Sequence, residues 1–281
     1  MKWIALAIAA AVPTLPAEPA AERVTAYEAA VHLARDIGSR PAASRTELRA
    51  QRYVERRFAR AGLETRITRF RVPGRGRGRS RNVIGIHDTP RRCLKIAMAH
   101  IDSVPAGPGA VDNASGVGVL VAIAGRLERL APRCDVWLVA TGAEERPYTG
   151  QPDHLGSTRL VRHVRSEGRA RSLRYALSID MVGRGRRFQL RSPRGGPRRG
   201  IERQLFAAGR SAGVPLRWRR DSGTGNSDHR EFELAGMPGL VMQLWRGLEP
   251  CWHEGCDTWR RLKPRSLRRA RRVVESALLR P

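Results

Sequence analysis

The chain has 281 residues, enough for one large α/β domain or two small ones. Its formal net charge is +27, and 50 of its 53 basic residues are arginines, a proportion typical of a GC-rich genome. Aromatic residues are few and do not alternate with the basic runs, so we expect no specific nucleic-acid binding and only weak association with anionic cell-surface polymers.

Residues 1–20 have the features of a secretory signal peptide. Lys2 precedes an apolar run over residues 3–12, and a Pro- and Ala-rich stretch follows. The run is shorter than the roughly 20 residues that a helix needs to cross a bilayer, and no other stretch approaches that length. We therefore expect a domain over residues 21–281 that is periplasmic or secreted, monomeric, and without a transmembrane segment in its mature form.

The pattern behind the signal peptide predicts two helices and then a strand, at residues 25–36, 45–62 and 63–72. Apolar strand-like runs then alternate with amphipathic helical stretches. The expected strands are 83–86, 93–99, 134–141, 174–182 and 239–244, and the expected helices are 116–130, 157–166, 200–213, 230–236 and 264–279. This alternation predicts a single α/β domain with a mostly parallel, mixed central sheet flanked by helices on both faces.

Two histidines and five carboxylates lie at or just beyond the carboxyl ends of the predicted strands. They are His100, Asp102, Asp112, Glu144, Glu145, Asp180 and His253. Open α/β sheets collect their ligand sites at these strand ends. Carboxylates gathered at one edge repel one another unless cations lie between them, and imidazole mixed with carboxylate suits zinc or a similar divalent ion.

The four cysteines favour disulfides, because an even number in an exported protein is typical of cross-links. The short spacing favours Cys251–Cys256, and Cys93 and Cys134 each open an apolar run, so they can pair at matching ends of neighbouring strands. His253 lies inside the first loop. We interpret that loop as a disulfide-stiffened turn that presents His253, with Asp257 as support, rather than as a Cys/His knuckle with its own metal.

Several motifs, in this order along the chain, resemble the zinc aminopeptidases of peptidase family M28, particularly the secreted bacterial ones. The motifs are HIDS (100–103), GAVDNASG (109–116), AEE (143–145), GST (156–158), IDMVG (179–183), SDHREFELAGMP (227–238) and CWHEGCDT (251–258). The similarity runs from about Thr25 to the C-terminus. As a set, these motifs are highly specific.

The resemblance implies two zinc ions per chain. One is expected on His100, Asp112 and Asp180. The other is expected on Asp112, Glu145 and His253, so that Asp112 bridges the two ions. The family relationship further implies hydrolysis of N-terminal, apolar residues from peptides with a free N-terminus, through a metal-activated water.

The same resemblance gives roles to residues beside the ligands. Glu144 matches the general base of the family, and Asp102 is expected to orient His100. Several secreted relatives have a tyrosine where this chain has Trp252, a difference that bears on substrate preference. Segment 146–155 should rim the pocket, and we interpret its Asp153 and His154 as loop residues rather than ligands.

Other functions fit parts of the same pattern. A metallocarboxypeptidase or another dizinc amide hydrolase would use the same metal chemistry, whereas a single-zinc glutaminyl cyclase is disfavoured by the complete ligand set. A non-enzyme alternative is an exported polyanion-binding protein with a structural metal site. A structural zinc site is closed by four ligands, so the additional Glu144 beside Glu145 favours an enzyme. The segment SDH at 227–229 is not a serine triad, because contiguous residues cannot form that relay.

Overall fold

A computed structural model describes residues 24–74, 77–145, 152–192, 199–221, 225–244 and 249–280. The predicted signal peptide at residues 1–20 lies outside the described residues, as do residues 146–151 of the predicted pocket rim. Within the described part of the chain, no helix is long and apolar enough to span a bilayer.

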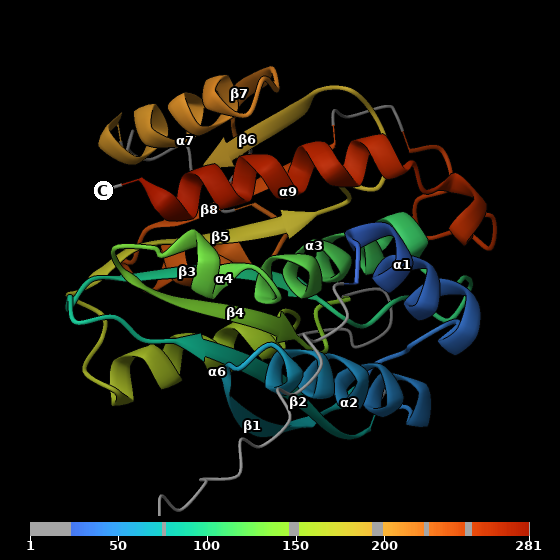
Figure 1. Cartoon of the computed structure of the whole chain (residues 1–281). Coiled ribbons are helices and arrows are strands. Elements are labelled where there is room, and N and C mark those ends of the chain that lie inside the picture. The colour runs from blue at the N-terminus through green and yellow to red at the C-terminus, as the bar shows by residue number, and fades with distance from the viewer. Residues whose placement is uncertain are drawn as a thin grey trace, which may run out of the picture.

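One eight-stranded mixed sheet organises the structure, in the order β1-β2-β4-β3-β5-β8-β6-β7 (Figure 1). The four central strands β4, β3, β5 and β8 are parallel to one another. On one side β2 and β1 are antiparallel neighbours, and on the other side β6 is antiparallel to β8 and parallel to β7. The strands are β1 (Glu64–Val72), β2 (Gly78–His87), β3 (Leu94–His100), β4 (Asp135–Thr141), β5 (Leu173–Asp180), β6 (Phe188–Ser192), β7 (Leu216–Arg220) and β8 (Gly239–Leu244).

Helices cover both faces of this sheet. The near face in Figure 1 is covered by α1 with its continuation η1 and by α2, α3, α7 and α9, and the opposite face by α6 and α8. Their bounds are α1 (Ala26–Val31), η1 (His32–Ile37), α2 (Arg45–Arg60), α3 (Ser115–Ala124), α6 (Leu155–Ser166), α7 (Arg199–Ser211), α8 (His229–Leu234) and α9 (Pro264–Leu279), with short turns η3 (Ala110–Ala114), α4 (Leu127–Leu130) and η4 (Trp259–Arg261).

The central strands are apolar on both faces because both faces are covered. Along β3, Ala97 and Ala99 pack in the cluster under α3, whereas Ile96 and Met98 pack in the cluster under α6. This alternation follows from the two-residue period of a strand. Helix α3 packs very closely: a Cβ atom on Gly118 would lie 2.4 Å from the carbonyl oxygen of Ala26.

The predicted fold class is confirmed: the chain forms an α/β domain with a mixed sheet that is parallel at its centre. Two details differ from the sequence-based expectation. The helix expected over 116–130 ends at Ala124 and is followed by the short α4, because the chain turns at Gly125. Strands β6 and β7 were not predicted, since they are short and β7 reads Leu-Arg-Trp-Arg-Arg.

Both predicted disulfides are present. The Cα atoms of Cys93 and Cys134 are 4.8 Å apart, and these residues immediately precede the register pair of β3 and β4 formed by Leu94 and Asp135. The Cα atoms of Cys251 and Cys256 are 5.4 Å apart in the loop after β8. One disulfide thus joins the amino ends of two central strands, and the other closes a loop beyond their carboxyl ends.

A buried lysine on β3 caps the last helix. Lys95 is fully buried, and its ammonium donates hydrogen bonds to the carbonyl oxygens of Ala277 (3.2 Å), Leu278 (3.0 Å) and Arg280. The last carbonyls of a helix lack partners within the helix, and a cation near them is favourable.

We expect Lys95→Met to lower the free energy of unfolding by about 3 kcal/mol, because it leaves buried carbonyl oxygens without donors. Urea denaturation measures this change. Arg174→Met, at an exposed position on β5, is the matched control and should change stability by no more than about 0.5 kcal/mol. Equal stabilities of the two variants would contradict the capping role.

Candidate active site

The chemically active residues gather where the four parallel strands end. His100 is the last residue of β3 and Asp180 the last residue of β5. Glu144 and Glu145 follow β4, and His253 follows β8. Since these four strands are adjacent and point the same way, their ends form one rim, as the sequence predicts.

Asp112 lies between the two histidines. Its Oδ1 is 3.1 Å from Nε2 of His100, which is also 3.5 Å from Oδ1 of Asp180. Its Oδ2 is 3.4 Å from Nε2 of His253, which is also 3.0 Å from Oε2 of Glu145. In each of these two triads the potential ligand atoms lie within 4.8 Å of one another. The five expected ligands thus form two triads that share Asp112.

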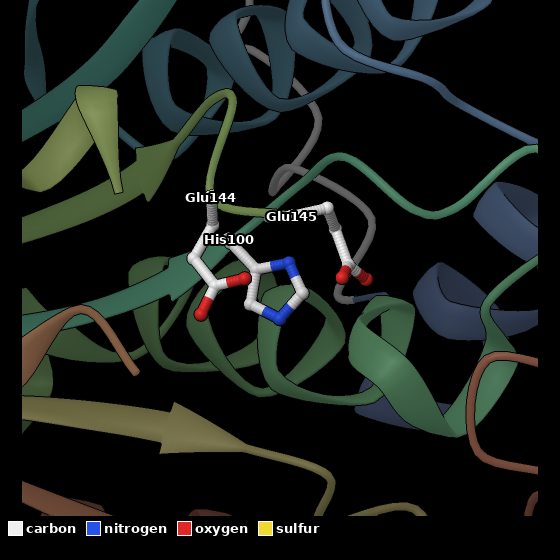
Figure 2. Close-up of side chains that lie close together, drawn as sticks. All are labelled: His100, Glu144 and Glu145. Carbon is white, nitrogen blue, oxygen red and sulfur yellow. The ribbon is translucent and has the colours of Figure 1, made fainter. Parts of the chain in front are cut away.

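A third grouping contains His100, Glu144 and Glu145, which Figure 2 shows with the two glutamates on either side of the imidazole. The carboxylate of Asp102 accepts hydrogen bonds from the backbone N–H groups of Glu144 (3.1 and 3.0 Å) and Glu145 (3.1 Å). Nδ1 of His100 is 3.2 Å from the backbone oxygen of Asp102 and 3.8 Å from its carboxylate. Asp102 therefore contacts the histidine and also positions both glutamates.

The disulfide loop supports Asp112 as well as presenting His253. The carboxylate of Asp257 accepts hydrogen bonds from the backbone N–H groups of Val111 (2.9 and 3.1 Å) and Asp112 (3.0 Å). The backbone oxygen of Asp257 accepts another from Ala110 at 3.1 Å. The loop that presents one histidine therefore also fixes the backbone of the shared carboxylate.

Arg40 holds the segment between His100 and Asp112, and sequence reasoning missed it. Its fully buried guanidinium donates to the carbonyl oxygens of Ile101 (2.8 Å), Pro108 (2.6 Å) and Gly109 (3.0 Å), and to Leu33 in the first helical segment (3.2 Å). Burial lowers the pKa of Arg40 to about 10, so the group stays charged at neutral pH. The cation thus fastens the site segment to the N-terminal helices.

Four residues in or beside the site have left-handed backbone angles without being glycine. They are Ala143 (φ 54°), His154 (φ 53°), Met181 (φ 49°) and His253 (φ 61°). Ala143 precedes Glu144, and Met181 follows Asp180. Such conformations cost about 1–3 kcal/mol each and occur preferentially at functional sites, where surrounding contacts maintain them.

The donor set fits a divalent cation. The carboxylates of Asp112, Glu144, Glu145 and Asp180 are buried, each at most 7% exposed. Burial and the neighbouring charge of Asp112 raise the pKa of Glu145 to about 8, and burial likewise raises the pKa of Asp180 above its usual value. Cations among these groups relieve their mutual repulsion and hold them ionised, and two imidazoles with carboxylate oxygens suit zinc.

Comparison with known proteins identifies the family. The sequence pattern of peptidase family M28 matches residues 82–278. The chain belongs to peptidase family M28. Membership of this family indicates a hydrolase that acts on peptides.

The chain is similar to several M28-like proteins. It is 28% identical to aminopeptidase YwaD of Bacillus subtilis over 214 residues, which are 71% of this chain and 44% of that protein. The chain spans less than two-thirds of the length of the curated relatives it matches.

Solved structures share the fold. A zinc aminopeptidase from Bacillus subtilis has a TM-score of 0.80 at 18% identity, covering 92% of this chain and 94% of that one. A glutaminyl cyclase from Bacteroides thetaiotaomicron has a TM-score of 0.78 at 20% identity, covering 94% and 99%. The fold is therefore common to peptidases and cyclases. Only the residues of the site can distinguish between these two activities.

His154 contacts the expected general base of this M28 chain, which sequence reasoning did not foresee. Its Nε2 is 3.0 Å from Oε1 of Glu144, and its Nδ1 is 3.3 Å from Oδ2 of Asp153, which pairs with Arg230. Burial opposes protonation of the imidazole, but the two carboxylates outweigh burial and raise the pKa of His154 to about 10. Neither Asp153 nor His154 falls in a candidate metal group of the described residues.

The SDH segment makes three separate contacts. Ser227 hydrogen-bonds to Ser178 (3.0 Å), Asp228 accepts from the hydroxyl of Thr141 (2.6 Å), and His229 contacts Asp221 (2.9 Å). These partners differ for each residue. The segment therefore braces β5, β4 and the end of β7 and is not a nucleophilic relay.

The site opens into a cavity of about 720 Å³. All five expected ligands and Glu144 line it, together with Asp153 and His154. Trp252, which immediately precedes His253, also lines it and is 47% exposed. The two triads are thus accessible to a small substrate or to the end of a peptide.

We expect the double variant Cys251→Ser/Cys256→Ser to lower the Zn²⁺ affinity of the triad Asp112, Glu145 and His253 about tenfold, because the loop that holds His253 and Asp257 loses its cross-link while every expected ligand remains. Equilibrium dialysis with Zn²⁺ measures the affinity of each triad.

The matched control is Cys93→Ser/Cys134→Ser, which removes the disulfide at the opposite ends of the strands. It should leave both affinities unchanged, whatever it does to thermal stability. Equal weakening by the two double variants would show that the loop disulfide has no specific effect on the site.

Proposed function

We propose that this M28 chain is an exported dinuclear zinc aminopeptidase that removes N-terminal residues from peptides. The observation that supports it most strongly is the position of Asp112, whose two carboxylate oxygens face two different histidines. A bridging carboxylate of this kind suits a pair of ions rather than a single one.

In this proposal His100, Asp112 and Asp180 hold one zinc ion, and Asp112, Glu145 and His253 hold the other. When bound, the two ions supply Lewis acidity to polarise the scissile carbonyl and to lower the pKa of water. The backbone contacts of Asp102 and Asp257 hold the ligand-bearing segments in place.

Glu144 belongs to neither of the two ligand triads, and we propose it as the general base. It takes a proton from the attacking water and returns it to the leaving amine. Its backbone N–H is fixed by Asp102, and His154 contacts its carboxylate, so its side chain is held from both ends.

The preference for a free N-terminus rests on the carboxylates of the site, which favour an ammonium group, and on the similarity to an enzyme named as an aminopeptidase. The expected apolar preference stays a prediction. A metallocarboxypeptidase would instead cleave an N-blocked peptide with a free carboxylate.

We further propose that residues 21–281 form the mature domain and that the protein is periplasmic or secreted. The two disulfides support export, because such cross-links persist in oxidising compartments. The monomeric state and the weak association with anionic polymers stay predictions.

Glutaminyl cyclases share this fold, so cyclisation of N-terminal glutamine is a second candidate. The pair of triads and the additional Glu144 favour hydrolysis. A polyanion-binding protein with a structural metal site would show salt-sensitive heparin binding and no turnover.

We expect Glu144→Gln to lower kcat for leucine p-nitroanilide by about 10³-fold while the protein still binds two Zn²⁺ ions. Release of p-nitroaniline and metal analysis of the same preparation measure both quantities, and chelation of the wild-type protein should abolish turnover. Zinc-loaded wild-type protein that hydrolyses no substrate with a free amine would refute the aminopeptidase function.

We expect His154→Gln to lower kcat by about tenfold with little change in KM, because the carboxylate of Glu144 loses its partner and misplacement of a catalytic group slows the chemical step. His32→Gln, outside the cavity lining, is the control. An unchanged kcat at normal zinc content would show that His154 does not position the base.

A further inference from the structure

The cavity continues from the metal-binding rim across the sheet toward its β6 and β7 edge. Asp180 on β5 pairs in register with Gln243 on β8, and Gln243 pairs with Gln189 on β6. Paired residues face the same side of a sheet. Both glutamines line the cavity, and the alternating residues Leu190 and Met242 pack with α7 and α9, so the glutamines face the other side of the sheet.

The floor of this extension is polar. Gln189 and Gln243 are 1% and 6% exposed, although their neighbours along the strands, Leu190 and Met242, belong to the apolar core on the other face. The amide nitrogen of Gln189 donates to the carbonyl oxygen of Leu244, but its buried Oε1 receives no hydrogen bond from any described residue. Only a hydrogen-bond donor satisfies that oxygen, so neither an apolar side chain nor a carboxylate gains from it, and a carboxylate bound here must be held by cations.

Arginines lie beyond the two glutamines. Arg191 is two residues after Gln189 and faces the same way, and Arg219 pairs with Arg191 in the register of β6 and β7. Arg220 and Arg230 also line the cavity. Four arginines thus line the same cavity as the metal-binding triads.

These cations differ in how fully they are neutralised. Arg230 pairs with Asp153 and Glu231, and Arg220 pairs with Glu202. Arg191 contacts the buried Asp221, at 2.5 Å, but that carboxylate is shared with His229.

Arg219 is exposed, and no carboxylate of the described residues lies within ion-pair distance of its guanidinium. Glu249, which also lines the cavity, is already paired with Arg184 and Arg261. Arg219 thus leaves positive charge for a ligand, whereas the charge of Arg191 is balanced by Asp221.

We propose that this extension, which we name the arginine wall (Gln189, Arg191, Arg219 and Gln243), binds the side-chain carboxylate of an N-terminal aspartate or glutamate. The inference rests on the proposed aminopeptidase function and replaces the expected apolar preference with an acidic one. An arginine in a partly enclosed site binds a carboxylate through charge-assisted hydrogen bonds.

The spacing of the strands fits this assignment. Neighbouring strands are about 4.8 Å apart, so Gln189 lies about 10 Å from Asp180, two strands away. Arg191 lies two residues further along β6 and Arg219 one strand further, so the arginine side chain must extend back toward a substrate glutamate that extends from the metal-binding rim.

The test compares four p-nitroanilides with the zinc-loaded full chain: glutamyl, aspartyl, glutaminyl and leucyl. Glutamine is the neutral match for glutamate. We expect kcat/KM for the glutamyl substrate to exceed that for the glutaminyl and leucyl substrates by about tenfold or more at low salt. The ratio should fall as salt is raised toward 1 M, where the screening length is about 3 Å.

Arg219→Gln should lower the glutamyl-to-glutaminyl ratio of kcat/KM by about tenfold, since Arg219 leaves no carboxylate behind. Arg219→Lys should restore part of the ratio, because it keeps the charge without the planar donor pair. Arg203→Gln, at an exposed position on α7 outside the cavity lining, should keep the wild-type ratio.

Equal kcat/KM for the glutamyl and glutaminyl substrates would overturn the proposal, as would a leucyl preference. A wild-type ratio in Arg219→Gln would overturn the role of the arginine wall.

The substrate C-terminus is a second carboxylate that the arginines could bind. The dipeptide Leu-Gly and its amide test this alternative, because only the free acid has that carboxylate. Faster cleavage of the free acid, without glutamyl preference, would assign the positive charge to the substrate C-terminus and overturn the side-chain assignment. Absence of turnover on all substrates would refute the proposed function and this inference together, whereas cleavage of the leucyl substrate alone would refute only the inference.

Discussion

The structure depends on one electrostatic constraint: several carboxylates are buried side by side at the ends of four parallel strands. Asp112, Glu144, Glu145 and Asp180 are at most 7% exposed, and burial of charge without compensation is expensive. Parallel strands bring these residues together because their loops emerge at the same edge. Compensation must therefore come from histidines, from bound cations and from donors in the surrounding backbone.

The carboxylates divide the work of binding and support. Asp102 and Asp257 turn their oxygens toward backbone N–H groups and so hold the segments that bear the ligands. Asp112 turns both its oxygens toward imidazoles. Arg40 adds a buried positive charge, and its guanidinium donates to the carbonyl oxygens of Ile101 and Pro108, on both sides of the loop between His100 and Asp112. The same residue type, aspartate, thus serves two purposes: those that accept hydrogen bonds from backbone N–H groups support the site, and the one that faces imidazoles is an expected metal ligand.

Sequence reasoning identified the residues whose position follows from strand ends or from close spacing. His100 and Asp180 terminate apolar runs, and Cys93 and Cys134 begin them, so their neighbourhoods follow from the register of parallel strands. Arg40 could not be recognised in the same way, because it is one of 50 arginines and its partners are backbone atoms that carry no sequence signal.

His154 and the β6–β7 edge show a second limit of sequence reasoning. The contact of His154 with Glu144 joins two residues ten positions apart, a spacing that carries no periodic signal. Strands β6 and β7 are short, and the arginines of β7 give it a surface-like pattern. The alternation of apolar and polar residues along a strand does not indicate which face of an edge strand borders a cavity.

The positive charge of the chain illustrates why position matters more than composition. As a count, an excess of arginines indicates only attraction to anionic surfaces, and most such residues lie in water where salt screens them. An arginine on a strand that borders a buried site instead acts at short range, on a ligand group bound in that site. Arg191 and Arg219 owe their significance to the pairing of β6 with β8 and with β7, which places them side by side, two residues along β6 from the row formed by Gln189, Gln243 and Asp180. The sheet that collects the carboxylates at one rim therefore also determines which of the many arginines can reach a substrate bound there.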